Sequence, residues 1–358
     1  MTEFDLATAA VEAALAAGAR YADARVRHRR TESMNARNGD VEDLSQHEGA
    51  GIGVRALVGS GWGFFAVPDL SGDGVRRAGQ RATEIATASA GVAGAHAGLI
   101  PATPSVASWA SPCAVDPLSV SLSSKGDLLA TATATAHRAG ADVAEALYQI
   151  WDTRTWLVSS EGHRIDQHIR ECGGGVNATV VGDGETQRRS YPSYRGQYGT
   201  RGWELMTELD LAAHAERIAA EARELLAAPA CPAGQTTLIL GGEQMALQIH
   251  ESVGHAIELD RILGWEAAYA GTSWLDLAEL GRLRYGSELM NITIDPTIPG
   301  ALGSFGYDDE GTRRPPATRS ATASGWACWP GGTAPPRPGW TTPAASGRTA
   351  GRGCRWSG

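Results

Sequence analysis

Two histidines and a glutamate within six consecutive residues, His250, Glu251 and His255, are the strongest sign of chemistry in this 358-residue sequence. Neutral imidazoles are common zinc ligands, and zinc lowers the pKa of a water molecule that it binds. A nearby carboxylate can then take a proton from that water as it attacks a peptide carbonyl. The pattern therefore predicts a Zn2+ site in which His250 and His255 are ligands and Glu251 is the general base.

The spacing of the two histidines differs from that of a regular helical metal site. Histidines four positions apart are about 40° apart around an α-helix, whereas five positions leave them roughly 140° apart. A π-bulge, whose hydrogen bonds join residues five apart, would bring both rings to one side. Gly254 tolerates such a distortion because it has no side chain. We therefore expect the helix over residues 243–257 to be kinked or π-bulged between His250 and His255.

The neighbours of the motif are small or apolar, among them Met245, Leu247 and Val253. They predict a largely buried helix and a dry site, in which a bound metal polarises its surroundings more strongly. The alternative is that two histidines and a glutamate fell together by chance in an ordinary core helix. The motif alone leaves both interpretations open.

The bulk composition excludes several classes of protein. With a formal net charge of −9 and a pI near 5.5, the chain lacks the clustered basic residues that nucleic-acid binding needs. No stretch approaches the roughly 20 apolar residues that cross a bilayer. The N-terminus carries Glu3 and Asp5 and is interpreted as an amphipathic helix, not a signal peptide. Five scattered cysteines imply no disulfide framework, so we expect a cytoplasmic protein with neither nucleic-acid nor membrane partners.

Composition and periodicity divide the chain into three α+β units and a tail. An N-terminal helix-plus-sheet domain is expected over residues 1–90, and a middle α+β domain over 118–229. Residues 91–117, rich in Ala, Gly, Pro and Ser, are interpreted as a linker. A C-terminal β-rich domain over 230–312 would carry the metal-binding helix and be incomplete, because the composition changes at residue 313.

Individual elements follow from the hydrophobic periodicity. Helices are expected over 5–18, 72–88, 121–139 and 210–228, and strands over 22–28, 51–58, 62–67 and, in several pieces, 143–183. Asn38-Gly39 predicts a hairpin turn because both residues tolerate positive φ. Three further expectations concern the triple glycine at 173–175 as a strand breaker, Asp210 as a helix N-cap, and 236–240 as a buried strand before the motif.

The tail from Arg313 to Gly358 has a composition of its own. It contains no Val, Ile, Leu, Met, Asp, Glu or Lys, and tryptophans are interspersed among Arg, Pro, Gly, Ala, Ser and Thr. Such a segment cannot build a packed core. Natural disordered tails are usually poor in tryptophan and rich in charge, so the composition favours a reading-frame shift in a GC-rich gene. We expect residues 313–358 to be aberrant or disordered.

Several separated segments, in the same order along the chain, resemble the TldD/PmbA family of zinc metallopeptidases. The C-terminal match, from Thr237 to Gly311, includes the metal motif, Glu258 and Asp260, the Ala-Gly-Thr-Ser at 270–273, and the segment from Gly303 to Gly311. The N-terminal match comprises YADARV at 21–26, the turn at 38–39 and GIGVRALVGSGWGFFAV at 51–67. The resemblance covers about residues 5–312.

This resemblance implies a zinc-dependent metallopeptidase of the catalytic, TldD-like type, which keeps the motif that partner-type members lack. His250 and His255 would be the ligands and Glu251 the general base. The resemblance also implies unfolded or precursor peptides as substrates, proteolysis as the role, and a dimer with a homologous PmbA-type subunit or with a second copy.

One departure from the family pattern concerns the third metal ligand. In the family this ligand is a cysteine well downstream of the second histidine. Here the pattern stops near Gly311-Thr312, and Cys328 and Cys354 lie in the aberrant tail, so neither is predicted as a ligand. We therefore expect a truncated or frameshifted chain of low activity. The alternative is a non-catalytic or inactive subunit of a TldD/PmbA-type heterodimer.

Two acidic groups near the motif leave their roles open. Glu258 and Asp260 could orient the ligand imidazoles, as carboxylates around metal sites often do, or could simply end the helix. Residues 308–310, Asp-Asp-Glu, could lie near the metal or form a solvated turn.

Two further patterns are weaker. His163, His168 and Cys172 could suggest a second metal site, but no matching partner cluster accompanies them and surface roles are favoured. The alternate glycines over 49–53 have the wrong spacing for a dinucleotide-binding loop and precede a strand instead of a helix.

Overall fold

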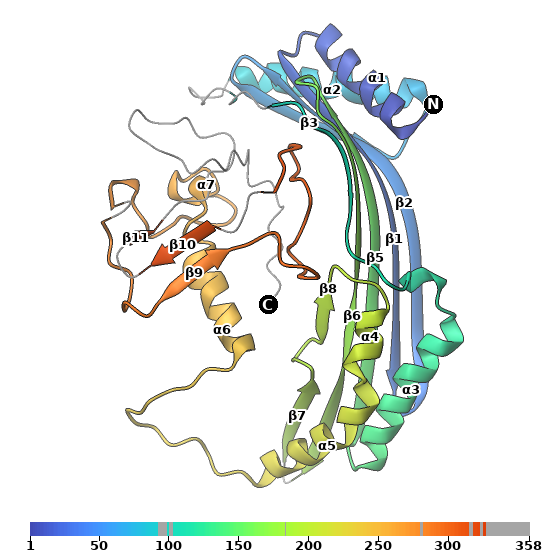
Figure 1. The fold of residues 1–358 in the computed structure, drawn as a ribbon, viewed down its shortest axis with the longest axis vertical. Coiled ribbons are helices and arrows are strands. Elements are labelled where there is room, and N and C mark those ends of the chain that lie inside the picture. Colours follow the sequence, from blue (N-terminus) through green and yellow to red (C-terminus); the bar gives the residue numbers. More distant parts are fainter. Residues whose placement is uncertain are drawn as a thin grey trace.

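The structure, a computed structural model, describes residues 1–91, 99, 103–182, 184–279, 282–314, 318–322 and 325–326. One long, curved sheet forms the body of the molecule, and its concave face holds the described residues from 228 onward, which we call the third unit (Figure 1). Helices cover the opposite, convex face of the sheet.

The long sheet has eight strands in the order β3-β2-β1-β5-β6-β4, with β7 and β8 also paired to β6. All pairs are antiparallel except β4 with β6. The four longest strands are β1 (Tyr21–Arg37), β2 (Asp40–Val58), β5 (Val143–Ser159) and β6 (Arg164–Gly182). The shorter ones are β3 (Gly61–Val67), β4 (Val106–Ala110), β7 (Glu185–Tyr191) and β8 (Gln197–Gly199).

The hairpin between β1 and β2 turns at Asn38-Gly39, as predicted, with positive φ angles of 50° and 106°. The two strands are much longer than the predicted segments 22–28 and 51–58, because they stay paired from Tyr21↔Leu57 down to Arg37↔Asp40. A long hairpin of this kind carries its side chains alternately to the two faces of the sheet. It therefore connects the core on the convex face with the surface under the third unit.

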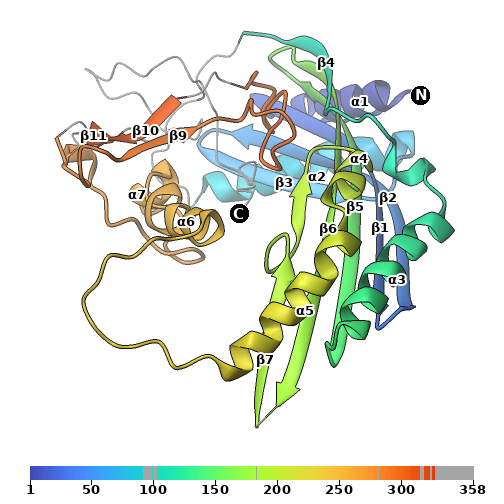
Figure 2. The same ribbon diagram turned by 60° about the horizontal axis from the view of Figure 1, so that its bottom comes forward.

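Two helix layers bury the convex face. The helices α1 (Glu3–Ala16) and α2 (Gly72–Ala90) pack on one half, where Ala22, Ala24 and Val26 are fully buried. The helices α3 (Leu122–Arg138), α4 (Glu204–Leu209) and α5 (Leu211–Ala227), with the short turn η1 (Pro117–Ser119), cover the other half. Figure 2 shows α3 and α5 lying along the strands below α1.

In the middle of the chain, one local prediction is wrong and another is confirmed only in part. The triple glycine does not break the sheet but lies inside β6. Glycine is needed there because neighbouring strands approach closely: a Cβ at Gly173 or Gly174 would lie only 2.1 or 2.2 Å from a backbone oxygen of another strand. Asp210 does occupy the N-cap position of α5, as predicted, but its φ of 42° is left-handed and its side chain makes no capping hydrogen bond. It separates α4 from α5 instead.

The third unit is reached through an extended segment, and here too a prediction is wrong. Residues 236–240 do not form a buried strand: they carry no β pairing, and Leu238 and Ile239 are 73% and 92% exposed. A strand needs a neighbour that satisfies its backbone hydrogen bonds. No described segment pairs with these residues.

Short elements make up the remainder of the third unit. Its helical turns are α6 (Gly242–Ile249), η2 (His250–Gly254), α7 (Leu259–Ile262) and η3 (Leu277–Glu279). Its sheet joins β9 (Asn291–Ile294), β10 (Thr318–Thr322) and β11 (Gly325–Trp326).

The three-part α+β architecture, with a C-terminal part that combines a small sheet with the motif helix, is confirmed. The domain limits at 1–90, 118–229 and 230–312 stay predictions, since one sheet runs through the first two units and includes β4 from the predicted linker. Most of the tail from residue 313 lies outside the described residues.

Candidate metal centre

The motif lies where one regular helix gives way to a wider turn. The helix α6 ends at Ile249, and His250–Gly254 form a π-helical turn. Its defining hydrogen bond runs from the His255 N–H to the His250 carbonyl oxygen, 3.0 Å away and five residues back. The predicted π-bulge is confirmed. Because a π turn places residues five apart nearly above one another, both imidazoles point to the same side.

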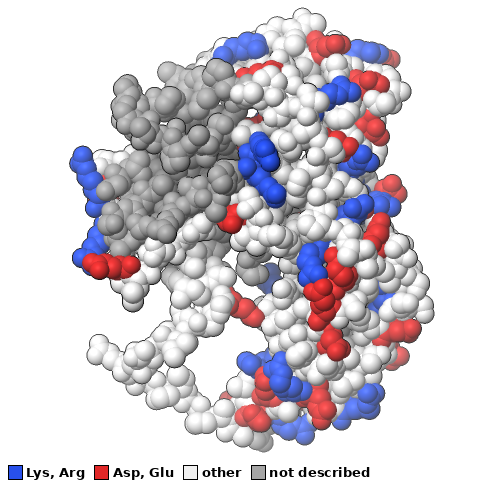
Figure 3. Space-filling view, in the orientation of Figure 1, with Lys and Arg blue, Asp and Glu red and all other residues white. Residues whose placement is uncertain are grey.

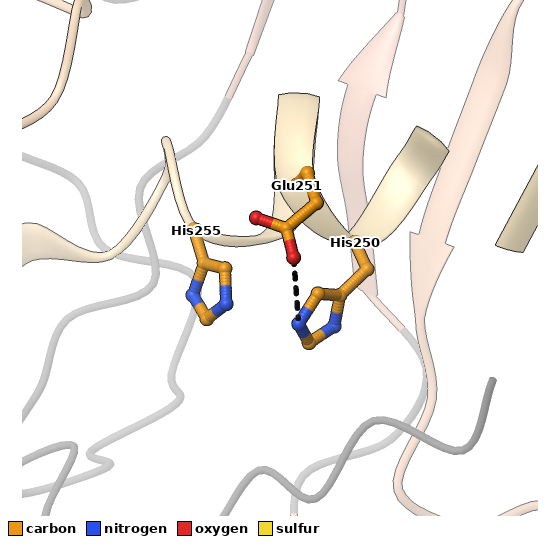
Figure 4. A group of neighbouring side chains, drawn as sticks. All are labelled: His250, Glu251 and His255. Carbon is orange, nitrogen blue, oxygen red and sulfur yellow. Dashed lines mark ion pairs between the residues drawn. The ribbon is translucent and has the colours of Figure 1, made fainter. Parts of the chain in front are cut away.

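The three motif side chains form one cluster (Figure 4). The rings of His250 and His255 lie edge to face with their centroids 4.4 Å apart. Glu251 Oε1 lies 3.8 Å from His250 Nε2. One donor atom from each of the three residues can be chosen so that all lie within 4.8 Å of one another. Among the described residues, no other group of three His, Cys, Asp or Glu side chains meets this condition.

This donor set fits zinc. Imidazole nitrogens are ligands in many catalytic zinc sites, and tetrahedral Zn–N bonds of about 2.0–2.1 Å need the two nitrogens about 3.4 Å apart. Donor atoms already within 4.8 Å require only small side-chain rotations to reach that spacing. The burial of His250, together with the charge of neighbouring His255, lowers the pKa of the His250 imidazole. This favours the neutral form, which is the form that binds a metal.

Glu258 supports one of the two histidines. His255 Nδ1 lies 3.1 Å from Glu258 Oε1, and the other oxygen of Glu258 pairs with Arg261 Nε at 2.5 Å. A carboxylate on Nδ1 fixes the ring and leaves Nε2 as the donor atom for a metal. Of the two roles left open, orientation of an imidazole is therefore supported for Glu258. Asp260 instead accepts a hydrogen bond from the backbone N–H of Arg261, at 3.0 Å.

A small hydrophobic core packs against the π turn and supports it. Val253, inside the π turn, is buried together with Ala256, Ile257 and Leu275, which follow it in the chain. Ser273 Oγ donates to the Ala256 carbonyl oxygen at 2.6 Å, which ties the segment 270–273 to the end of the motif. Sequence reasoning assigned no role to Ser273, although the resemblance includes its segment. A serine shortly after an apolar helix gives too weak a signal to indicate this contact.

The prediction of a largely buried helix and a dry site is wrong. No residue of α6 is buried, Leu247 is 53% exposed, and the Glu251 side chain is 63% exposed. The buried apolar residues of the small core begin at Val253, inside the motif, and none of them comes from α6. The side chains of His250 and His255 are 29% and 26% exposed, so the cluster is half-buried at the surface of the third unit.

The acidic segment 308–310 neither joins the cluster nor forms a solvated turn. It docks on the concave face of the long sheet, where Glu310 Oε1 lies 3.0 Å from Arg55 Nη1 and is 4% exposed. Arg25 Nη2 donates to the Asp309 carbonyl oxygen. Gln167 accepts from the backbone N–H groups of Gly306 and Tyr307 at 2.9 Å. This docking places the third unit against the sheet.

The weaker histidine and cysteine signals do not converge. His168 Nε2 lies 2.6 Å from Asp152 Oδ1 on the long sheet, His163 Nδ1 accepts from the Ser105 N–H, and Cys172 is buried in the core. Cys113 and Cys231 likewise lie outside the motif cluster. Cys328 and Cys354 lie outside the described residues.

Comparison with known proteins covers all three units. Domain models described as PmbA/TldA metallopeptidase domain 1, central domain and C-terminal domain match residues 22–86, 115–226 and 233–318. A metalloprotease of Methanocaldococcus jannaschii is 28% identical over 294 residues, which cover 81% of this chain and 61% of that protein. A metalloprotease TldD homolog of Haemophilus influenzae is 27% identical over 303 residues, covering 81% and 59%. The chain thus spans about 60% of the length of these curated relatives.

Solved structures show the same fold. A Thermotoga maritima protein described as a candidate modulator of a DNA gyrase aligns with a TM-score of 0.65 and 15% identity, over 92% of this chain and 70% of that one. TldE from Thermococcus kodakarensis aligns with a TM-score of 0.57 and 12% identity, over 89% and 68%. Since the three family domains match in order and together cover most of the sequence, the chain belongs to the PmbA/TldD metallopeptidase family.

Proposed function

We propose that this chain is a zinc-dependent peptidase of the TldD type, with His250 and His255 as metal ligands and Glu251 as the general base. The observation that supports this most directly is the π turn, which gathers the three side chains into one cluster. A π turn interrupts the regular hydrogen bonding of a helix and is frequent at functional sites. A chance pair of histidines in a plain core helix would not need it.

The roles of the side chains follow from their positions. Zinc bound at the cluster would lower the pKa of water and polarise the carbonyl of the scissile peptide. Glu251, with its largely exposed carboxylate, takes the proton of the attacking water and delivers it to the leaving amine. Glu258 keeps His255 in the orientation that presents Nε2.

The substrate and partner are part of the same proposal. Unfolded or precursor peptides suit a half-buried site that lies at the surface, because an extended chain can reach it. A homologous PmbA-type subunit, or a second copy, would cover the exposed apolar side chains of the third unit, such as Tyr269 and Leu289, which are 84% and 92% exposed. The fold likeness to TldE is consistent with a partner of this kind.

The cellular setting that we propose is the cytoplasm, with no nucleic-acid or membrane partner. A net charge of −9 disfavours nucleic acid. Within the part of the chain that the structure describes, no helix combines the length and apolar character needed to span a membrane.

A non-catalytic subunit is the second candidate, and one observation favours it. The described residues offer two imidazoles and one carboxylate, and none supplies the cysteine that the resemblance implies as third ligand. Two imidazoles alone hold zinc more weakly than three or four ligands. Such a chain could complete a heterodimer without hydrolysing peptides itself.

Metal content and hydrolysis measured on the same preparations test the proposal. We expect the wild-type chain to retain zinc after dialysis and His255→Ala to lose it. Glu251→Gln should keep the metal and lower the rate of peptide hydrolysis by roughly 10²- to 10⁴-fold. Glu258→Gln should weaken zinc binding by roughly 10- to 100-fold.

The two candidate functions give opposite results in a mixture with a homologous subunit. If Glu251→Gln in this chain abolishes hydrolysis by the mixture, this chain is the catalytic one. If the mixture is active and Glu251→Gln leaves its rate unchanged, this chain is the non-catalytic subunit. Failure of the wild-type chain to bind zinc, alone and in the mixture, contradicts the metal assignment.

A further inference from the structure

Arg261 is a lone basic residue in the acidic stretch of sequence that carries the metal cluster. Residues 225–281 contain seven Asp and Glu residues and a single Lys or Arg, which is Arg261. The segment that leads into α6 shows no charged side chain at all in the space-filling view (Figure 3). Within this stretch, a permanent positive charge beside the cluster therefore comes from Arg261.

The guanidinium of Arg261 contacts the carboxylate that orients His255. The helix α7 begins directly after Glu258, and Arg261 lies three positions farther on, which brings the two side chains together. Arg261 Nε lies 2.5 Å from Glu258 Oε2, while Glu258 Oε1 lies 3.1 Å from His255 Nδ1. The Glu258 and Arg261 side chains are only 22% and 19% exposed. One half-buried carboxylate thus connects the arginine to the imidazole.

The other arm of the guanidinium is tied to the segment over 266–273. Arg261 Nη1 donates a hydrogen bond to the Ala270 carbonyl oxygen at 2.9 Å. The backbone N–H of Ser273 donates to the Arg261 carbonyl oxygen at 3.3 Å. Because a guanidinium is planar and rigid, fixing Nη1 also fixes the direction of Nε. The segment therefore holds Arg261 in the position from which it contacts Glu258.

Arg261 also separates acidic groups that would otherwise repel one another. Glu266 Oε2 lies 3.9 Å from Arg261 Nε. Burial raises the pKa of Glu266 and the charges of Asp260 and Glu258 raise it further, whereas Arg261 lowers it. These acids therefore share one cation. If that cation is removed, repulsion favours rotation of the Glu258 carboxylate away from His255 and into solvent.

We propose that Arg261 is a positioning residue of the metal centre, which holds the Glu258 carboxylate on His255 Nδ1 and so keeps Nε2 free to bind the metal. This inference rests on the proposed function for the metal. A neutral imidazole carries its proton on one of its two nitrogens, and the hydrogen bond at that nitrogen selects which one. A carboxylate only accepts hydrogen bonds, so Glu258 selects the form with the proton on Nδ1.

The position of the proton on His255 can be measured without zinc. Long-range ¹H–¹⁵N correlation spectra of the zinc-free, ¹⁵N-histidine-labelled chain, recorded at about pH 8 where imidazoles are neutral, show which ring nitrogen carries the proton. The spectrum of His255→Ala identifies the His255 signals. We expect Nδ1 to carry the proton in the wild-type chain and Arg261→Gln to shift it toward Nε2. A His255 spectrum that is the same in both chains overturns the inference.

Zinc affinity tests whether Arg261 acts through Glu258. Competition with a coloured chelator should show that Arg261→Gln binds zinc roughly tenfold more weakly than the wild-type chain. In a chain that already carries Glu258→Gln, the same substitution should change the affinity less than about twofold, because the side chain through which Arg261 acts has lost its charge. Equal losses in the two backgrounds would show that Arg261 does not act through Glu258.

Arg261→Lys separates positioning from a purely structural role. It keeps a cation within reach of Glu258 but lacks the second arm that contacts the Ala270 carbonyl oxygen. We expect proton placement and zinc affinity close to those of the wild-type chain, together with faster hydrogen exchange over residues 266–270. If Arg261→Lys instead lowers the zinc affinity as much as Arg261→Gln does, Arg261 acts only by holding that segment and the inference fails.

Arg282→Gln is the matched control, because Arg282 is an exposed arginine of the same unit. It removes the same charge and should leave both the His255 spectrum and the zinc affinity unchanged. Equal effects of Arg282→Gln and Arg261→Gln contradict the inference. Proton placement that depends on Arg261 in a chain that binds no zinc upholds the positioning role while the proposed function fails. Zinc binding that does not depend on Arg261 has the opposite meaning.

Discussion

The long sheet and the third unit are stabilised in different ways. Both faces of the hairpin β1–β2 are covered: the helices α1, α2 and α3 pack on one, and the other receives the docked segment. In the described part of the third unit, the hydrophobic cluster behind the motif has four buried residues, and large apolar side chains such as Ile239 and Leu289 are exposed. The candidate chemistry thus lies on the less densely packed part of the molecule.

This difference indicates that the long sheet serves as a scaffold for the third unit, which carries the candidate site. Proteins commonly place functional groups on segments of low local stability and let a rigid scaffold position them. Here the contacts of Arg25, Arg55 and Gln167 with residues 306–310 are among the links that hold the third unit on that scaffold. Thr200 adds hydrogen bonds to the carbonyl oxygens of Gly300 and Ala301. Substitutions in the scaffold should therefore affect the whole fold, whereas substitutions in the third unit should act locally.

The largest effect is expected from a buried charge in the scaffold. Lys125 is fully buried on α3, and its Nζ lies 2.5 Å from Oε1 of Glu32 on β1, which also accepts a hydrogen bond from Tyr148 at 2.8 Å. Glu32→Ala leaves that ammonium group without its partner. We expect a loss of about 3–5 kcal/mol in the free energy of unfolding, measured by urea denaturation.

An exposed pair provides the control for this prediction. Glu84 pairs with Arg81 on the surface of α2, where both side chains are more than half exposed. Glu84→Ala should cost less than about 1 kcal/mol, because water screens such pairs. Comparable losses for Glu32→Ala and Glu84→Ala would show that the buried pair does not stabilise the sheet.

A smaller and local effect is expected from the core of the third unit. Ile257, which is 2% exposed, packs directly behind the π turn. Ile257→Ala should cost about 2 kcal/mol, near the lower end for such substitutions, because a small core can partly collapse around the cavity. Hydrogen exchange should show faster opening over residues 253–257 and unchanged protection in β5.

Ile298 offers a matched control because its side chain is 50% exposed in the same unit. Ile298→Ala should leave the exchange of residues 253–257 unchanged. If Ile257→Ala instead accelerates exchange equally in β5, the third unit and the sheet unfold together and the contrast between the two regions fails.

Sequence reasoning succeeded where the cause was local. The π turn was predictable because five-residue spacing of two histidines, with Gly254 between them, conflicts with a regular helix. The hairpin at Asn38-Gly39 was predictable because those residues tolerate positive φ. The four predicted helices and the predicted strands before residue 184 followed in the same way from hydrophobic periodicity, although several strands proved longer. The strands β4, β7 and β8 and the helix α4 were not predicted.

Sequence reasoning failed where the structure depends on residues far away in the chain. Glu310 accepts a hydrogen bond from Arg55, which is 255 positions away in the sequence, and no local sequence pattern predicts that pair. A glycine run can break a strand or let strands approach closely, and only the atoms beside Gly173 and Gly174 decide which. The exposure of α6 and of residues 236–240 likewise depends on what packs against them. The metal-ligand and general-base roles of His250, His255 and Glu251 stay a proposal.

The smallest effect concerns the contact between the two regions and its dependence on pH. Burial raises the pKa of Glu310 to about 8; Arg55 opposes this and the charge of Asp308 adds to it. Burial also raises the pKa of Asp308 to about 6. Because both values lie above those of the exposed carboxyls, the docked state holds protons that the detached state releases. This contribution to docking is complete below the ordinary pKa values and is lost as the pH rises through about 8.

Raising the pH from 7 to 9 should therefore weaken docking of residues 303–311 by roughly 1 kcal/mol. Hydrogen exchange of these amides, corrected for its intrinsic dependence on pH, measures the change. Glu310→Gln should flatten the response over this range, since Asp308 titrates lower, whereas Glu279→Gln, at an exposed position of the same unit, should leave it intact. A slope that persists unchanged in Glu310→Gln would assign the pH response to another group. The third unit would then be held on the sheet by Gln167 and the backbone contacts, independently of the buried acid.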